Sequence, residues 1–276
     1  MQKFFLLITF SALLSACSQH YFYAPNTLHL PEVREKGEAT LEAALTGSSQ
    51  IKGVEVKAAY AINPSYSVMA NHAFMRGSFT RSASFVFPPP PDEYHSGSGF
   101  ISEAGISRHF PMSQYAQFTM TAGVGIGRSM NDYDRGRTAR LNFNRIFLQP
   151  GISSRGELVD FGIGLRFSRL HFYDGRVDYA IAENDIQDVL EIDQHGAFYI
   201  PDIGLSAGIS FSPVHLKYNM VVSASEKLSQ YSFSGNNISF SMLIDINAFT
   251  PKNKTKSGKS TKKKTSTHKK KKKKKH

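Results

Sequence analysis

Several features that often carry a fold or an activity are missing from this chain of 276 residues. It has one cysteine and no tryptophan, so no intrachain disulfide can form and stability must come from burial and backbone pairing. It has no apolar run of the ~20 residues that a membrane-spanning helix needs. Cys/His metal spacing, a phosphate-binding glycine loop and a nucleophile elbow are also absent. We therefore expect no cofactor and no metal, and the motifs favour no catalytic site.

The single cysteine closes a short apolar stretch at the N-terminus. Lys3 supplies a positive charge, Phe4 to Leu14 is apolar, and Leu14-Ser15-Ala16-Cys17 follows. This tetrapeptide resembles the bacterial lipobox, where a signal peptide is cut and the new N-terminal cysteine is lipidated. The resemblance implies a signal peptide over 1–16, lipidation of Cys17 and membrane lipid as a partner. The alternative is a buried N-terminal helix with an incidental cysteine.

The net charge of +11 is concentrated in a C-terminal tail. Residues 251–276 hold 14 of the 33 Lys and Arg and none of the 22 Asp and Glu, so residues 1–250 carry 19 basic against 22 acidic side chains. A nucleic-acid-binding domain clusters its basic residues on folded elements, and we expect no nucleic-acid partner. The tail, placed at 250–276, is low-complexity and predicted to be disordered.

Period-two alternation dominates the region between the two ends. The clearest case is 158–167, where Val159, Phe161 and Ile163 share one face with Leu165 and Phe167, while Asp160, Gly162, Gly164 and Arg166 share the other. Such alternation predicts strands. Ten segments show it, with 66–76 and 139–151 fitting worst: 39–46, 53–62, 66–76, 98–110, 118–129, 139–151, 158–167, 202–211, 214–225 and 238–247.

The length and faces of these segments separate two architectures. Strands of soluble sandwiches have ~5–6 residues, whereas a tilted strand that crosses a membrane has ~9–11. One face is almost wholly apolar, and the other mixes glycine, serine and charge. We therefore predict an all-β fold, a closed antiparallel up-and-down transmembrane β-barrel of about ten strands over 38–249, preceded by a lipidated linker over 17–37.

The links between the segments alternate in length. Tight turns are expected near 63–64, 111–114, 153–156 and 212–213, and longer links at 78–97, 130–138, 174–197 and 226–236. Outer-membrane barrels alternate short periplasmic turns with long outer loops. The chain thus resembles the small bacterial outer-membrane β-barrel proteins, including an aromatic residue, Phe249, at the end of its last strand. The resemblance implies an outer-membrane location, and an even strand number would put both termini on the periplasmic side.

Three groups of residues are candidates for function. Charges on the inner face would form a salt-bridged plug, a narrow pore or a catalytic pair: Glu42, Glu55, Lys57, Glu103, Asp160, Arg166, Asp202, Lys217 and Asp245. An acidic outer loop would be solvated or bind divalent cations: Asp174, Asp178, Glu183, Asp185, Asp188, Glu191 and Asp193. Asp132 and Asp134 lie at the outer rim, with no histidine in an obvious pairing position.

These observations favour a lipoprotein barrel with a structural or binding role in the cell envelope, exercised through its outer loops and its basic tail. Fourteen lysines would attract anionic cell-wall polymers or lipid headgroups. Three alternatives stay open, namely a narrow channel, a hydrolase or protease acting at the rim, and a lipid-anchored soluble periplasmic β-protein.

Overall fold

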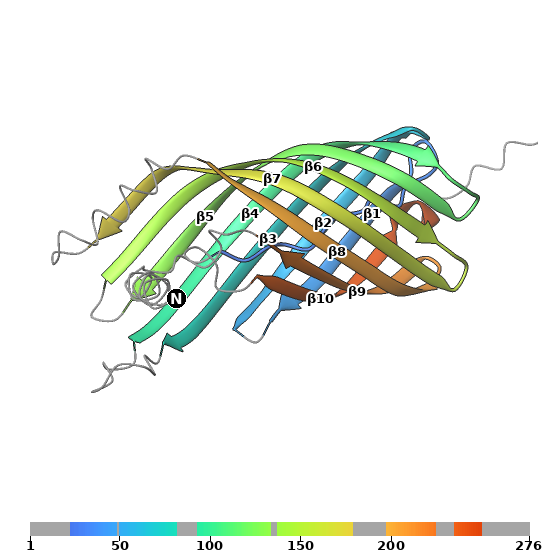
Figure 1. Ribbon diagram of the computed structural model, residues 1–276. Helices are drawn as coiled ribbons and strands as arrows, with labels where there is room; N and C mark the ends of the chain where they lie inside the picture. The colour runs from blue at the N-terminus through green and yellow to red at the C-terminus, as the bar shows by residue number, and fades with distance from the viewer. Residues whose placement is uncertain are drawn as a thin grey trace, which may run out of the picture.

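The computed structural model describes residues 23–48, 50–81, 93–133, 137–178, 197–224 and 235–249. These residues form ten strands and one short 3-10 helix, η3 (Ile246–Phe249), drawn in Figure 1. The strands are β1 (Ala39–Gly47), β2 (Ile51–Asn63), β3 (Tyr66–Arg81), β4 (Glu93–Pro111), β5 (Ala116–Tyr133), β6 (Arg137–Arg155), β7 (Val159–Asp178), β8 (Ala197–Phe211), β9 (Val214–Ser223) and β10 (Asn236–Asp245).

Each strand pairs antiparallel with its neighbours in sequence, and β1 pairs with both β2 and β10. This pairing closes the sheet into a barrel and, among the described residues, leaves no edge strand in the part where all ten strands are paired, so the backbone groups there are satisfied without water. The predicted closed up-and-down barrel is confirmed, and each of the ten expected segments matches one strand, although 158–167, 214–225 and 238–247 extend one or two residues past their strands. No helix among the described residues is long and apolar enough to cross a membrane.

The two ends of the barrel differ in their connections. Links 64–65, 112–115, 156–158 and 212–213 define the turn end, and links 48–50, 82–92, 134–136, 179–196 and 224–235 define the loop end. The alternation in length is less strict than expected, because 48–50 and 134–136 are short although they lie at the loop end. Most of the expected 130–138 loop is hairpin, with Tyr133 opposite Arg137.

Strand lengths make the barrel asymmetric. β1, β9 and β10 have 9 or 10 residues, whereas β4, β6 and β7 have 19 or 20. In Figure 1 the long strands project at the loop end well past the short ones. The loop-end mouth is therefore high along β3–β7 and low along β9, β10 and β1.

An apolar belt faces outward around the part of the barrel nearest the turn end. On β7 the exposed side chains from Val159 to Phe167 are all apolar, while Asp160 and Arg166 between them are 1% exposed. Eight residue steps of ~3.4 Å, tilted by ~40°, give a belt of roughly 21 Å, close to the ~25 Å of an outer-membrane barrel. This inside-out pattern is the arrangement of a barrel surrounded by hydrocarbon.

Beyond the belt the two faces exchange character. On β7 the outward residues become Arg169, Tyr173 and Arg176, and the inward residues become Leu170 and Phe172. A buried apolar cluster fills the loop-end half of the barrel. Its members are Tyr23, Ala24, Ile51, Ala73, Met75, Ile101, Ala139, Leu141, Phe143, Leu170, Phe172 and Ile200. The exchange indicates that the loop-end extension stands in water, with polar side chains outside and an apolar core inside.

Two further features lie on the outer surface. Aromatic side chains are exposed around the turn end, among them Tyr60, Tyr66, Phe110 and Phe211, as expected for an interfacial girdle.

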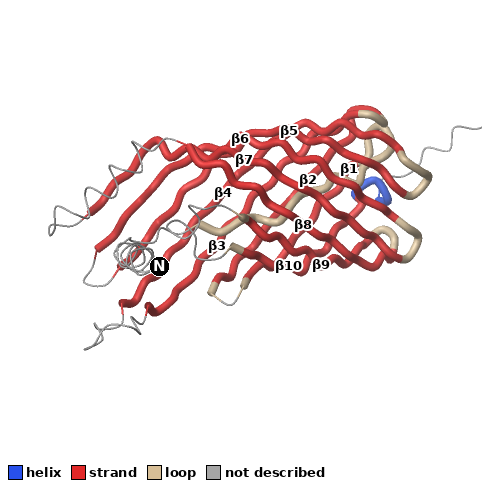
Figure 2. The backbone as a smooth tube through the Cα atoms, viewed as in Figure 1, coloured by secondary structure: helices blue, strands red, loops and turns tan. Residues whose placement is uncertain are grey.

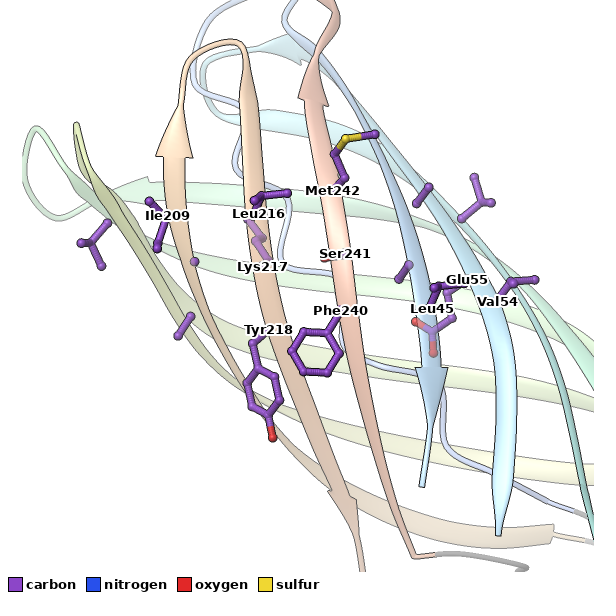
Figure 3. Close-up of a pocket in the computed structure, with 16 residues that line it drawn as sticks. Leu45, Val54, Glu55, Ile209, Leu216, Lys217, Tyr218, Phe240, Ser241 and Met242 are labelled. Carbon is purple, nitrogen blue, oxygen red and sulfur yellow. The ribbon is translucent and has the colours of Figure 1, made fainter. Parts of the chain in front are cut away.

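On the short-strand side, a shallow apolar groove of about 950 Å³ crosses β8, β9, β10, β1 and β2. Its outward-facing side chains belong to the same belt (Figure 3).

Candidate functional site in the barrel interior

The barrel interior is occupied by the protein's own N-terminal segment. Residues 23–34, here named the lumen segment, have no regular secondary structure and run between the barrel walls (Figure 2). Nearly all are buried, and Asn26, Thr27 and Val33 have no exposed surface. Because the segment forms no ladder, the walls satisfy its backbone with their side chains. Gln117 and Gln149 donate to the carbonyl oxygens of Pro31 (2.8 Å) and His29 (2.6 Å).

The order of these contacts fixes the direction of the lumen segment. Arg34 donates to backbone carbonyls of the β4–β5 turn at 2.6 Å, at the turn end. Thr27 is midway, with its amide 3.0 Å from Glu55 of β2. The carbonyl of Pro25 accepts from Asn237, the second residue of β10, at 2.8 Å, and Tyr23 packs on Phe143 in the loop-end cluster. The segment thus runs from the loop end at Tyr23 to the turn end at Arg34.

This path corrects two expectations. The segment expected to be a linker over 17–37 is, in its described part, largely a filling of the lumen. The expectation that both chain ends leave at the turn end also fails for the described chain. Tyr23 lies in the loop-end half, whereas β10 and η3 end the described chain at the turn end, because Asp245 pairs with Thr40. An even number of strands does not locate the N-terminal end when the chain first passes through the barrel.

An arginine-carboxylate cluster surrounds Asn26 at mid-barrel. Arg145 of β6 lies 2.8 Å from Glu103 of β4, and Arg166 of β7 lies 2.7 Å from Asp202 of β8. Asn26 joins the two pairs, because its amide donates to Glu103 at 2.6 Å and it accepts from Arg145 (2.8 Å) and, on its backbone carbonyl, from Arg166 (3.0 Å). All four charges are almost wholly buried, which is tolerable only because each is paired.

A second group of charges lies around β1, β2 and β9. Lys57 is 3.2 Å from Glu42 and 3.7 Å from Glu55, and Thr27 donates to Glu55 with both its amide and its hydroxyl. Lys217 of β9 forms an ion pair of 2.7 Å with Glu32 of the lumen segment. The lumen segment therefore supplies two members of this network, Thr27 and Glu32, and cross-links distant strands.

A third group closes the turn end. Arg155 lies 2.8 Å from Glu38 and 3.3 Å from Asp245, and its guanidinium also reaches His215. Nδ1 of His215 is 2.6 Å from Asp160. These residues come from β6, β7, β9, β10 and the residue before β1. Their ion pairs and hydrogen bonds therefore connect opposite walls of the barrel at the turn end.

Glycines on the inner wall make room for the lumen segment. A Cβ added at Gly151 would lie 2.4 Å from Cδ2 of Leu30, and one added at Gly204 would lie 2.9 Å from Cδ1 of Leu28. A methyl group at either position would overlap a leucine side chain. The inner-face glycines next to Leu28 and Leu30, Gly151 of β6, Gly162 and Gly164 of β7 and Gly204 of β8, thus belong to a filled interior.

The predicted site residues are distributed as follows. Of the predicted inner-face charges, Asp245 is half-buried and the other eight are buried inside the barrel. Of the predicted acidic loop, Asp174 and Asp178 lie in β7, so they are not loop residues. Five further members lie outside the described residues: Glu183, Asp185, Asp188, Glu191 and Asp193. Asp132 is exposed at the end of β5, and Asp134 and Cys17 also lie outside the described residues.

Two arginines that complete the network were not among the predicted inner-face charges. Arg145 and Arg155 supply the cations for Glu103, Glu38 and Asp245. One signal was available: the six acidic candidates for the inner face outnumbered the three basic ones, which implies that more cations must face inward. The contribution of the lumen segment left no such signal.

The arrangement does not resemble a hydrolytic site. Ser210 and Asp160 both contact Nδ1 of His215, at 2.9 and 2.6 Å, whereas a catalytic triad has the serine and the carboxylate on opposite ring nitrogens. His109 contacts Ser67 and Thr119, and no carboxylate of the described ranges bonds to it. Among the described residues, no three His, Cys, Asp or Glu side chains are grouped so as to hold a metal ion.

No protein-family model matches this sequence, and no curated protein matches it. Solved structures with a similar chain trace include the outer-membrane protease OmpT of Escherichia coli (TM-score 0.41, 10% identity, 75% of this chain and 92% of that one). The Ail protein of Yersinia pestis (0.29, 12%, 75% and 95%) and the transport unit of the E. coli autotransporter AIDA-I (0.38, 9%, 79% and 92%) are also similar. At these scores the likeness carries no argument about function, and the assignment as a barrel rests on the strand pairing.

Proposed function

We propose that this chain is a bacterial outer-membrane lipoprotein whose sealed β-barrel has a structural or binding role in the cell envelope. Lipid on Cys17 and the apolar belt would hold it in the membrane. The lysine tail after Phe249 would bind anionic cell-wall polymers or lipid headgroups on the periplasmic side. Short turns at one end and longer links at the other support this orientation.

The filled lumen is the observation that favours a structural or binding role over a channel. The lumen segment crosses the interior and is bonded to seven strands, β2, β4, β5, β6, β7, β9 and β10. An open water path would require these buried pairs to separate. We therefore expect the purified full-length protein to give no stepwise conductance in planar bilayers. Steady single-channel conductance of the intact chain would refute the sealed barrel and favour the channel.

Two measurements test the membrane assignment. A barrel in lipid keeps its compact form in detergent and migrates differently in a gel before and after boiling, whereas a soluble periplasmic domain does not. Spin labels at Ile163 and Ile209, both exposed in the belt, should report contact with acyl chains. A label at Arg169, just beyond the belt, is the matched control and should report water.

Deletion of 252–276 tests the role of the tail. We expect the shortened protein to form the same barrel and to lose its co-sedimentation with purified cell wall at low salt. Replacing the lysines by serine at unchanged length is the control for chain length. Retention of cell-wall binding by both variants would show that the tail is not the contact.

A further inference from the structure

The lumen segment decides on which side of the membrane the N-terminal lipid can lie. The partners of the segment move steadily along the barrel, from the β4–β5 turn at Arg34, through Glu55 at Thr27, to Asn237 at Pro25. The chain therefore enters the barrel at the loop end and reaches β1 from the turn end. The part of the chain that precedes Tyr23 must therefore join the lumen segment in the loop-end half of the barrel.

On the side of the short strands β9, β10 and β1, the lumen segment enters the barrel close to the rim. Asn237 is the second residue of β10, and Thr46, which donates to Asn237 at 2.7 Å, is the last but one of β1. Pro25 is thus level with the ends of the two strands that close the barrel. On this side, the barrel wall extends little beyond Pro25 toward the loop end.

The length of the chain limits where Cys17 can be. Six residue steps separate it from Tyr23, and a fully extended chain spans at most ~3.6 Å per step, so Cys17 lies within roughly 21 Å of Tyr23. To reach the leaflet at the turn end, the chain would have to cross the rim and then descend the outside of the apolar belt, which is roughly 21 Å high. The interior offers no return path, because the lumen segment already fills it.

We infer that the lipid on Cys17 is anchored in the leaflet at the loop end, the outer leaflet of the outer membrane, so that the mature N-terminus is displayed on the cell surface. This inference rests on the proposed lipoprotein function. It gives the chain a lipid anchor on one side of the membrane and a polybasic tail on the other. The partner of the anchor is then the acyl region of the outer leaflet.

Cysteine labelling of intact cells tests the inference. The variant His20→Cys places a thiol three residues after the anchor, Ser84→Cys places one in the 82–92 link, and Ser257→Cys places one in the tail. Each is treated with a membrane-impermeant maleimide before and after permeabilisation, and only protein with the heat-modifiable gel shift is counted. We expect His20→Cys to label in intact cells as fully as Ser84→Cys, and Ser257→Cys to label only after permeabilisation.

The outcomes separate the inference from the function on which it rests. If His20→Cys labels only after permeabilisation, as Ser257→Cys should, the inference is overturned. The unsubstituted protein should not label at all, because acylation blocks its only thiol, and it should incorporate an alkyne analogue of palmitate that Cys17→Ala does not. If the unsubstituted protein reacts with maleimide and takes up no palmitate analogue, the lipoprotein assignment fails, whatever the position of residue 20.

Discussion

Replacing Arg145 by methionine should be among the most damaging single substitutions in this barrel. The Arg145 side chain is fully buried and bonded to Glu103, Asn26 and the hydroxyl of Tyr23. Removing one partner of a buried ion pair costs ~3–5 kcal/mol, because the other charge stays buried. Glu103 keeps the amides of Asn26 and Asn71, at 2.6 and 3.2 Å, and a longer ion pair of 3.9 Å with Arg166. We therefore expect the lower limit, about 3 kcal/mol, or more than a ~100-fold shift in the unfolding equilibrium.

Urea titration of the full-length protein in detergent, followed by loss of the compact gel band, measures this shift. Arg128→Met is the matched control, because Arg128 faces outward on β5, is half-buried and makes a hydrogen bond of 2.8 Å to Asn142. It should cost less than ~1 kcal/mol. The double variant Arg145→Met, Glu103→Gln removes both charges and should recover most of the loss.

The reasoning would be refuted by either of two results. Equal midpoints for Arg145→Met and Arg128→Met would mean that Arg145 is not a buried partner of Glu103. A double variant as unstable as Arg145→Met alone would mean that the loss arises from packing, and not from an uncompensated charge.

Other substitutions test the filled interior, the belt and the sealing. Gly151→Val should overlap Leu30 and destabilise the barrel by ~1–3 kcal/mol in the same urea titration, and adding Leu30→Ala should restore part of the loss. Ile163→Lys should cost ~2–4 kcal/mol in lipid vesicles, whereas a charge near the rim of the belt costs ~0–1; an equal cost at both depths would contradict the belt. Replacing 23–33 by glycine and serine at unchanged length should open an ion path and give bilayer conductance that the intact chain lacks.

The sequence predicted the ten strands because most of each strand lies in one environment. Along 159–167 the outward residues are all apolar and the inward ones are charged or glycine, so the pattern predicted both the strand and which face points outward. The segment 139–151 fitted worst for a physical reason. Phe143 faces the loop-end core and Ile146 faces outward in the belt, so the apolar face changes sides within the strand and blurs a period of two.

The lumen segment could not be predicted in the same way. Its residues do not pair with a neighbouring strand, so neither face nor period is imposed on them, and proline at 25 and 31 is typical of a link. Its position is set by isolated bonds from side chains on seven strands, such as Asn237 to Pro25. Only the assembled barrel brings those side chains together. The charge imbalance on the inner face indicated missing partners but not that Glu32 would contribute to the same network.

The lumen segment also limits how this barrel can change state. Its downstream end continues into β1 within a few residues, and Arg155 ties Glu38 to the wall there at 2.8 Å, so it cannot slide far toward the turn end. Movement toward the loop end would have to separate Lys217 from Glu32 and leave both charges without their partner in a narrow interior. The proposed loop-end anchoring of Cys17 would add a second restraint, because a lipid held in the outer leaflet cannot be drawn through the barrel. A segment fixed at both ends acts as a permanent filling that ties opposite walls together, the task that disulfides perform in proteins with more than one cysteine.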